Sequence, residues 1–423
     1  MSEQKIVICD EAKRLIKEGD AKTAKGLLKD HLRDVPNDTA ALYLLASVYR
    51  TEKRYTRARK CLERLLQETP ADQPAQYLMA CVDMEEGSYQ VAAKGLEKFL
   101  QKNPQDAYAH NSIAFCYNRL GRARDAEDHL KTAIGINPSD PYNYYCLALL
   151  FLDRGEPLVA EGHLKQGLKA VPRDPQLREQ LARLHLSRGD IDSAIQDFEL
   201  LTKHYPNLDR GFLGLGRCFM EKGVTEQALL HFAIAREKDP KAWEGHAYAG
   251  LVHHELGELA QAVEFYTRSL ELYPDNPKVQ ANLSEATMRL GMVIKPFLTL
   301  NQTITTAKDY HYARYLLAKL YAKEELFDRA EEELLEAVKL DPRDVYTQNL
   351  LADVYLKANK VSDARKVLDS ISKDNQDPYT QLLKGKLLFR EGKKEEAKKL
   401  LRELIKEKLP DEVLQEARRL IGP

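Results

Sequence analysis

Prolines recur along this chain at intervals of 34 residues, and this spacing strongly limits what the chain can fold into. The series comprises Pro36, Pro70, Pro104, Pro138, Pro172, Pro206, Pro240, Pro274, Pro342 and Pro410, with Lys308 and Gln376 where it is interrupted. Series of alanine and of glycine follow the same interval through most of the chain. A fixed period of this length indicates a tandem array of one structural repeat.

Each repeat reads as two amphipathic helices. In residues 39–70 the first helix carries an apolar stripe at i, i+3, i+4 and i+7 spacing, made by Leu42, Leu45, Ala46 and Tyr49. The glycine that follows this helix in most repeats suits a left-handed C-terminal cap, and the closing proline cannot continue a helix. One such hairpin cannot bury its stripe alone, so neighbouring hairpins must stack.

This pattern resembles the tetratricopeptide repeat, whose signature has an aromatic residue or Leu, then Leu-Gly/Ala, Tyr, Gly, Ala, an aromatic residue or Leu, and a closing Pro. The resemblance covers twelve repeats, from about residue 5 to residue 411. It implies an all-α fold, a right-handed superhelical solenoid of tandem 34-residue helix-turn-helix repeats. It also implies that the first helices of the repeats line a concave groove.

The array divides into four predicted segments. We expect repeats one to eight at 5–276, a divergent repeat nine at 277–310, repeats ten to twelve at 311–412, and a capping helix at 413–423. The two arms on either side of repeat nine each carry a tyrosine-rich set of residues.

Repeat nine departs from the pattern at several places while keeping the period. Pro296 replaces the series alanine, Lys308 replaces the closing proline, and Ser284 and Thr287 stand where Ala and Tyr are usual. Pro296 falls in the first turn of its helix, where backbone N–H groups have no intrahelical partner, so the helix should persist. Repeat nine is therefore either a hinge between the two arms or a degenerate repeat.

Composition excludes several classes of function. The 64 Lys and Arg residues balance 65 Asp and Glu residues, which gives no electrostatic case for nucleic-acid binding. The longest apolar run, 146–152, is far too short to cross a bilayer, so no membrane insertion is expected. Six scattered cysteines without a C-x-x-C pair, and a beginning without the features of a secretory signal, favour a cytoplasmic protein with reduced thiols.

No sequence motif predicts chemistry. The stretch 211–216, "GFLGLG", lies within a predicted first helix, where Gly216 occupies a packing position, so a phosphate-binding loop is not expected. His246 and the "HHE" of 253–255 lack the spacing of a metal-binding motif, and His246 and His253 occupy core positions. We therefore predict a protein that is not an enzyme, with no catalytic residue, no metal site and no cofactor.

The candidate binding residues lie on the face of the first helices opposite the core stripe. They recur at 3-4-3 spacing and form two tyrosine-rich sets separated by repeats with mainly charged residues on this face. The first set is Tyr43, Tyr77, Tyr108, Asn111, Phe115, Asn118, Tyr142 and Tyr145, and the second is Tyr312, Tyr315, Lys319, Tyr346, Asn349 and Tyr379. Tyr43, Tyr77, Tyr145 and Tyr315 also stand where packing between repeats commonly uses tyrosine.

Aromatic rings supply contact area at low entropic cost, and amides can hold a peptide backbone. These sets therefore predict a non-enzymatic scaffold or adaptor that binds a partner protein or peptide in the groove. Two alternatives remain open: a self-assembling structural protein, which would be a homo-oligomer, and a regulatory subunit of a separately encoded enzyme. No repeat has Lys and Asn at the two groove places used by chaperone-tail clamps, so that subtype is not expected.

Overall fold

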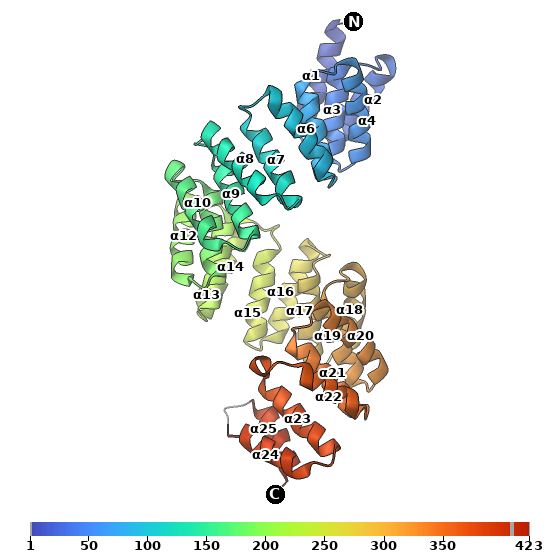
Figure 1. The fold of residues 1–423 in the computed structure, drawn as a ribbon, viewed down its shortest axis with the longest axis vertical. Coiled ribbons are helices and arrows are strands. Elements are labelled where there is room, and N and C mark those ends of the chain that lie inside the picture. Colours follow the sequence, from blue (N-terminus) through green and yellow to red (C-terminus); the bar gives the residue numbers. More distant parts are fainter. Residues whose placement is uncertain (1, 407–409, 423) are drawn as a thin grey trace. The chain divides into compact units, whose positions relative to one another are not determined.

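The computed structural model describes residues 2–406 and 410–422, and in these residues it contains α-helices, one short 3₁₀ helix and no strand. The chain divides into two compact units, Met1–Pro206 and Asn207–Pro423, which we call the N-terminal half and the C-terminal half. In each half the helices follow one another as stacked hairpins (Figure 1). This confirms the all-α tandem-repeat fold.

The N-terminal half contains repeats one to six, each made of a first and a second helix. The first helices are α1 (Ser2–Lys17), α3 (Thr39–Thr51), α5 (Gln73–Glu85), α7 (Ala107–Arg119), α9 (Pro141–Asp153) and α11 (Pro175–Ser187). The second helices are α2 (Ala21–Asp34), α4 (Tyr55–Glu68), α6 (Tyr89–Lys102), α8 (Ala123–Ile136), α10 (Pro157–Ala170) and α12 (Ile191–His204).

The C-terminal half contains repeats seven to twelve and a final helix. The first helices are α13 (Asp209–Glu221), α15 (Glu244–Glu255), α17 (Pro277–Arg289), α19 (His311–Lys323), α21 (Val345–Lys357) and α23 (Pro378–Arg390). The second helices are α14 (Thr225–Lys238), α16 (Leu259–Leu272), α18 (Ile294–Thr306), α20 (Phe327–Leu340), α22 (Val361–Ser370) and α24 (Lys394–Leu404), followed by α25 (Asp411–Ile421).

The turn between the two helices of a repeat uses the left-handed backbone region, as the glycine series predicts. Gly87 and Gly121, for example, have φ of 92° and 75°. Where the series lacks glycine, Lys53, Glu325 and Asn359 take the same conformation with φ of 56°, 58° and 61°. The turn geometry is therefore kept even where the side chain makes it unfavourable.

The first helices begin at a second series of residues with a period of 34. The carboxylates of Asp72, Asp106 and Asp174 accept hydrogen bonds from backbone N–H groups in the first turns of α5, α7 and α11. Asn276 caps α17 in the same way, and Asp344 caps α21. These caps satisfy N–H groups that have no partner within the helix and so fix where each first helix starts.

Small residues on the first helices face large residues on the second helices throughout the core. In repeat four Ala114 and Leu130 belong to one buried cluster. In repeats seven and eight the small residue is glycine and the large one is aromatic: a Cβ on Gly216 would lie 2.4 Å from the ring of Phe232. Gly216 is thus a packing residue inside α13.

Repeat nine keeps both of its helices. Pro296 is buried in the first turn of α18, which continues to Thr306, so the expected survival of this helix is confirmed. The hydroxyl of Thr303 donates to the side-chain oxygen of Gln280 at 2.8 Å, and the hydroxyls of Ser284 and Thr287 donate to backbone carbonyls in α17. These polar side chains are buried beside apolar ones such as Leu283 and Leu300, so the core of this repeat includes several hydrogen-bonded hydroxyl groups. The hinge role stays a prediction.

The array ends with a shortened repeat and an added helix. α22 has ten residues and is followed by a 3₁₀ turn at Lys373–Asn375. Repeat twelve is shifted by one residue, because Gly392, Ala397 and Leu401 each lie one residue before their place in the period of 34. α25 packs Val413 and Ala417 against Leu401 and Leu404 of the last repeat, as the predicted capping helix would. Residue 423 of that prediction lies outside the described residues.

Candidate partner-binding grooves

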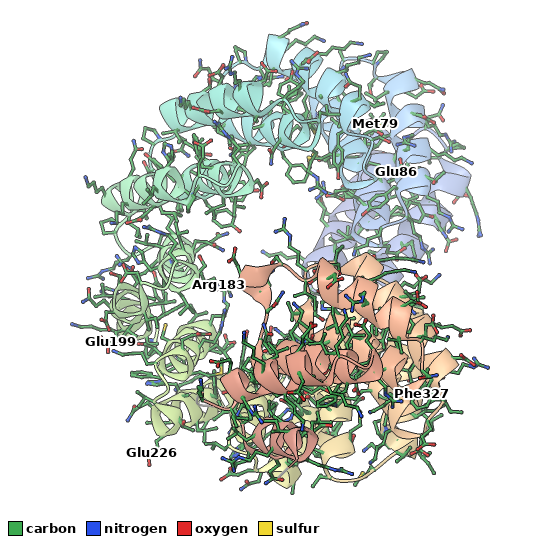
Figure 2. All side chains as sticks on the ribbon, turned by 60° about the horizontal axis from the view of Figure 1, so that its bottom comes forward. Met79, Glu86, Arg183, Glu199, Glu226 and Phe327 are labelled. Carbon is green, nitrogen blue, oxygen red and sulfur yellow. The ribbon has the colours of Figure 1, made fainter. Side chains whose placement is uncertain are left out.

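Seven of the eight predicted residues in the N-terminal half line one groove. It has a volume of about 800 Å³ and is walled mainly by α5, α7 and α9. The predicted residues in its wall are Tyr77, Tyr108, Asn111, Phe115, Asn118, Tyr142 and Tyr145. The groove lies on the side of the repeats that the first helices form. Figure 2 shows the two sides in repeat six: Arg183 lies on the side of the first helix, α11, and Glu199 lies on the opposite side, on the second helix, α12.

Three aromatic rings of this groove are exposed to solvent. Tyr108, Phe115 and Tyr142 have relative exposures of 64%, 48% and 46%. Phe115 contacts Tyr89 of α6 edge to face, with ring centroids 6.0 Å apart, and Tyr142 lies 6.2 Å from Tyr145. Large apolar side chains left open next to one another are typical of a surface that a partner covers.

Polar groups in the groove are held in fixed orientations. The phenol oxygen of Tyr77 lies 3.0 Å from the hydroxyl of Ser112, which joins repeats three and four. The side-chain nitrogen of Asn143 donates to the carbonyls of Ala133 and Asn137, so its oxygen must face Asn111. That oxygen accepts from the Asn111 nitrogen at 2.7 Å.

This chain of hydrogen bonds leaves one acceptor of the groove unused. Because the nitrogen of Asn111 is directed at Asn143, its side-chain oxygen is turned away, and it has no hydrogen-bond partner among the described residues. A buried acceptor without a partner costs free energy. This oxygen lies beneath the groove surface, so it is not a contact point for a bound segment.

The phenols of Tyr77 and Tyr142 and the thiol of Cys146 keep their protons near neutral pH. Burial raises the pKa of the Tyr77 phenol to about 12 and that of the Cys146 thiol to about 11. The neighbouring Cys146 and partial burial also raise the pKa of Tyr142. The charged side chains are engaged: Asn118 donates to Asp153 at 2.9 Å, and the Arg119 guanidinium lies over the ring of Tyr89. The groove thus offers aromatic surface and neutral hydrogen-bonding groups.

Tyr43 is the one predicted residue of the first set outside this groove. It is partly buried on α3 and packs against the core cluster of repeats one to three. Tyr89 and Met84 line the groove although the sequence did not single them out. Tyr89 begins the second helix α6, whereas every predicted residue lies on a first helix.

The C-terminal half has a second, smaller groove of about 440 Å³. Lys319 and Tyr379 are the predicted residues in its wall, together with apolar side chains of α17, α19 and α21. Asp353 pairs with Lys357 at 2.8 Å, and Glu285 accepts a hydrogen bond of 2.7 Å from Tyr312. Burial raises the pKa of the Tyr379 phenol, so its hydroxyl stays neutral.

The remaining residues of the second set lie around this groove without lining it. Tyr312 and Tyr315 stack with centroids 5.8 Å apart, and Tyr315 packs against two core clusters. Tyr346 is 71% exposed at the start of α21. Asn349 is buried, donates to Asp377 and accepts from Thr380, each at 3.0 Å. A binding role for each of these residues stays a prediction.

Neither half presents a metal site or a membrane span in its described residues. No group of three or more His, Cys, Asp or Glu side chains there is arranged to hold a metal ion. No helix of the same residues is both long and apolar enough to cross a membrane.

Family models of the tetratricopeptide repeat match most of the chain. The matched residues are 15–80, 83–149 and 334–387 for one model, 145–208 and 213–277 for a second, 311–344 for a third and 379–407 for a fourth. Residues 278–310, which form repeat nine, fall between the matched ranges. No curated protein matches the chain in sequence.

Solved structures of the same architecture match over much of the chain. The crystal structure of the APC/C hetero-tetramer Cut9-Hcn1 matches with a TM-score of 0.51 and 15% identity, covering 96% of this chain and 95% of that one. Pseudomonas aeruginosa pilF matches with a TM-score of 0.44 and 20% identity, covering 49% of this chain and 96% of its own. MamA from Desulfovibrio magneticus RS-1 matches with a TM-score of 0.37 and 19% identity, covering 39% of this chain and 94% of its own.

The chain therefore belongs to the tetratricopeptide-repeat family, as its period, its turn geometry and the family models agree. Proteins built from this repeat are interaction scaffolds, and the fold is typically not catalytic. The similarity to the solved structures concerns the fold alone.

Proposed function

We propose that this protein is a non-enzymatic adaptor that holds a segment of a partner protein in the groove of α5, α7 and α9. The observation that carries the proposal is the exposure of Tyr108, Phe115 and Tyr142 on adjacent first helices around one groove. Burying three such rings would supply several kcal/mol, since fully burying one aromatic side chain is worth about 1.5–3 kcal/mol.

The polar groups of the groove support an extended peptide as the occupant. The Tyr108 phenol, which is 64% exposed in the groove, can donate to a backbone carbonyl of such a segment. The few charges of the groove are engaged within the chain, so the bound segment would be recognised through apolar side chains and backbone rather than through charge.

Site-specific photo-crosslinking tests this proposal. A photoreactive phenylalanine analogue replaces Phe115, and in a matched variant it replaces Leu158, which is 67% exposed on α10 of the same half. We expect a specific protein adduct from position 115, reduced by adding Tyr142→Ala, and none from position 158. An equal pattern of adducts from both positions would show that the groove is not the binding site.

A further inference from the structure

The last residue of the first helix changes its charge along the array. In repeats one to eight its charge varies: it is acidic in Glu85, Asp153, Glu221 and Glu255, cationic in Lys17 and Arg119, and neutral in Thr51 and Ser187. In the four final repeats it is always a cation: Arg289, Lys323, Lys357 and Arg390. The one-residue shift of repeat twelve does not break this series, because Arg390 still ends α23.

Three of these cations lie in the wall of one groove. Arg289, Lys323 and Lys357 line the groove of the C-terminal half, and Lys319 adds a fourth positive charge to them. Arg289, Lys319 and Lys323 are exposed, and none of the three forms an ion pair with another described residue. Methionine and leucine side chains lie between them, namely Met288, Met292, Leu320 and Leu350.

A cation at the end of a helix also stabilises the helix, because it faces the negative end of the helix dipole. The fold does not require that effect here. Glu221 and Glu255 end α13 and α15 in the same half, and Ser187 ends α11. The run of cations therefore points to a ligand.

We propose that the groove of α17, α19 and α21 binds an extended acidic segment of a partner protein. Neighbouring helices pack about 8–10 Å apart, so the cations of successive first helices repeat at roughly that distance. A chain in the polyproline II conformation rises about 3.1 Å per residue with about three residues per turn, so every third side chain recurs on one face about 9 Å on. Acidic residues at every third position would then meet the cations, and aliphatic residues between them would meet the methionines and leucines.

The groove fits an acidic protein segment better than a nucleic acid. Glu285 and Asp353 stand in the same wall as the cations and would oppose a continuous line of phosphates. Tyr379 is mostly buried, so its ring is not an open platform for stacking a base. A protein segment, in contrast, can place an uncharged side chain opposite the carboxylates of Glu285 and Asp353.

This site is separate from the proposed function, because it lies in the other half of the chain and uses charge. Variants of the groove in the N-terminal half, such as Tyr108→Ala with Tyr142→Ala, should leave it unaffected. The two proposals can therefore fail independently.

Fluorescence anisotropy on the 423-residue chain tests the proposal with synthetic peptides of about ten residues. The probe carries Glu at every third position with Leu and Ser between. The comparison probes are a peptide of the same composition with its Glu residues contiguous, the same peptide with Lys in place of Glu, and a single-stranded oligonucleotide. We expect the spaced acidic peptide to bind most tightly and to weaken as salt is raised.

The test variants replace a groove cation with the residue that ends the first helix of another repeat, so the fold should stay intact. Arg289→Glu copies Glu255, and Lys323→Ser copies Ser187. Each should weaken the spaced peptide roughly tenfold with an unchanged Tm, while Lys295→Glu, outside the groove in α18, should bind as the unaltered chain does. The proposal is overturned if the spaced peptide does not bind, if the contiguous peptide or the oligonucleotide binds as tightly, or if the two groove variants bind unchanged.

Discussion

The two halves of this molecule carry grooves of different chemistry on one repeating scaffold. The groove of the N-terminal half is aromatic, with its charges engaged, whereas the groove of the C-terminal half presents unpaired cations between aliphatic side chains. Both grooves use equivalent positions of the first helices. The period of 34 residues sets where such positions fall, and the residues placed there decide what each groove can bind.

Repeat seven of the C-terminal half and repeat four of the N-terminal half also differ in core packing, and the largest expected effect tests that difference. Gly216→Ala should destabilise the C-terminal half by about 2 kcal/mol, because its Cβ would lie 2.4 Å from the ring of Phe232. Adding Phe232→Leu recreates the alanine–leucine pair of repeat four and should recover part of the loss. Urea denaturation of the single and double variants measures this coupling.

The control for this cycle is Gly162→Ala in the N-terminal half. Gly162 is helical, and a Cβ there would meet nothing within 4 Å. This substitution should stabilise the chain by up to about 1 kcal/mol through helix propensity. The packing account would be contradicted if the double variant lost as much unfolding free energy as the Gly216→Ala and Phe232→Leu variants lose together.

Repeat nine is the predicted hinge within the C-terminal half, and hydrogen exchange can test it. We expect amides of α18 to open at a free energy lower by roughly 1 kcal/mol than those of α16 and α20, because threonines reduce helix propensity and Thr303 places a polar group in the core. Uniform protection of the three helices would identify a degenerate repeat that does not act as a hinge.

Turn residues with a positive φ offer a matched pair of substitutions, one in each half, with smaller expected effects on stability. Lys53→Gly and Glu325→Gly should each stabilise the chain by roughly 0.5–1 kcal/mol, because both residues hold a positive φ that glycine adopts without strain. Asn359→Gly should gain less, since asparagine tolerates this region better. Thermal unfolding measures the change, and a loss of stability would show that the side chains make contacts that outweigh the strain.

Buried histidines should make both halves less stable in acid, with a small contribution from each residue. Burial lowers the pKa of His129 and His163 in the N-terminal half and of His246 and His254 in the C-terminal half. A base whose folded pKa lies below its unfolded value of about 6.5 contributes stability above that pH and loses it as pH falls through the folded pKa.

Denaturation midpoints at about pH 7.5 and about pH 5.5 measure this loss. His254→Gln should reduce the difference between the two midpoints, whereas His204→Gln, at an exposed position, should leave it unchanged. If the midpoint difference between the two pH values is the same in the unaltered chain and in both variants, His254 is excluded as a cause of the acid sensitivity.

The periodic residues of the sequence were sufficient to predict the helical hairpins. Glycine at the turn, proline at the exit and alternating small and large residues act locally or between adjacent helices, so a single sequence reveals them. The spacing on the first helices likewise placed Tyr108, Phe115 and Tyr142 on the face where the groove lies.

The sequence could not predict how far neighbouring helices cover each side chain. Asn111 and Asn349 occupy equivalent positions, yet Asn111 keeps an unused oxygen while both groups of Asn349 are engaged by Asp377 and Thr380. Tyr43 and Tyr77 occupy equivalent positions and both pack against a core cluster, yet only Tyr77 lines the groove. These outcomes depend on contacts between repeats. The cation series at Arg289, Lys323, Lys357 and Arg390 is visible in the sequence, but its place in a groove wall depends on the packing of neighbouring repeats.

Affinity capture with two groove variants tests most directly whether the halves bind different partners. The proteins are the unaltered chain, Tyr108→Ala with Tyr142→Ala, and Arg289→Glu with Lys323→Ser, each captured at physiological salt and quantified by mass spectrometry. The account predicts that the tyrosine variant loses one set of partners and retains those lost by the cation variant. Loss of the same partners from both variants, or retention of all partners by both, would contradict it.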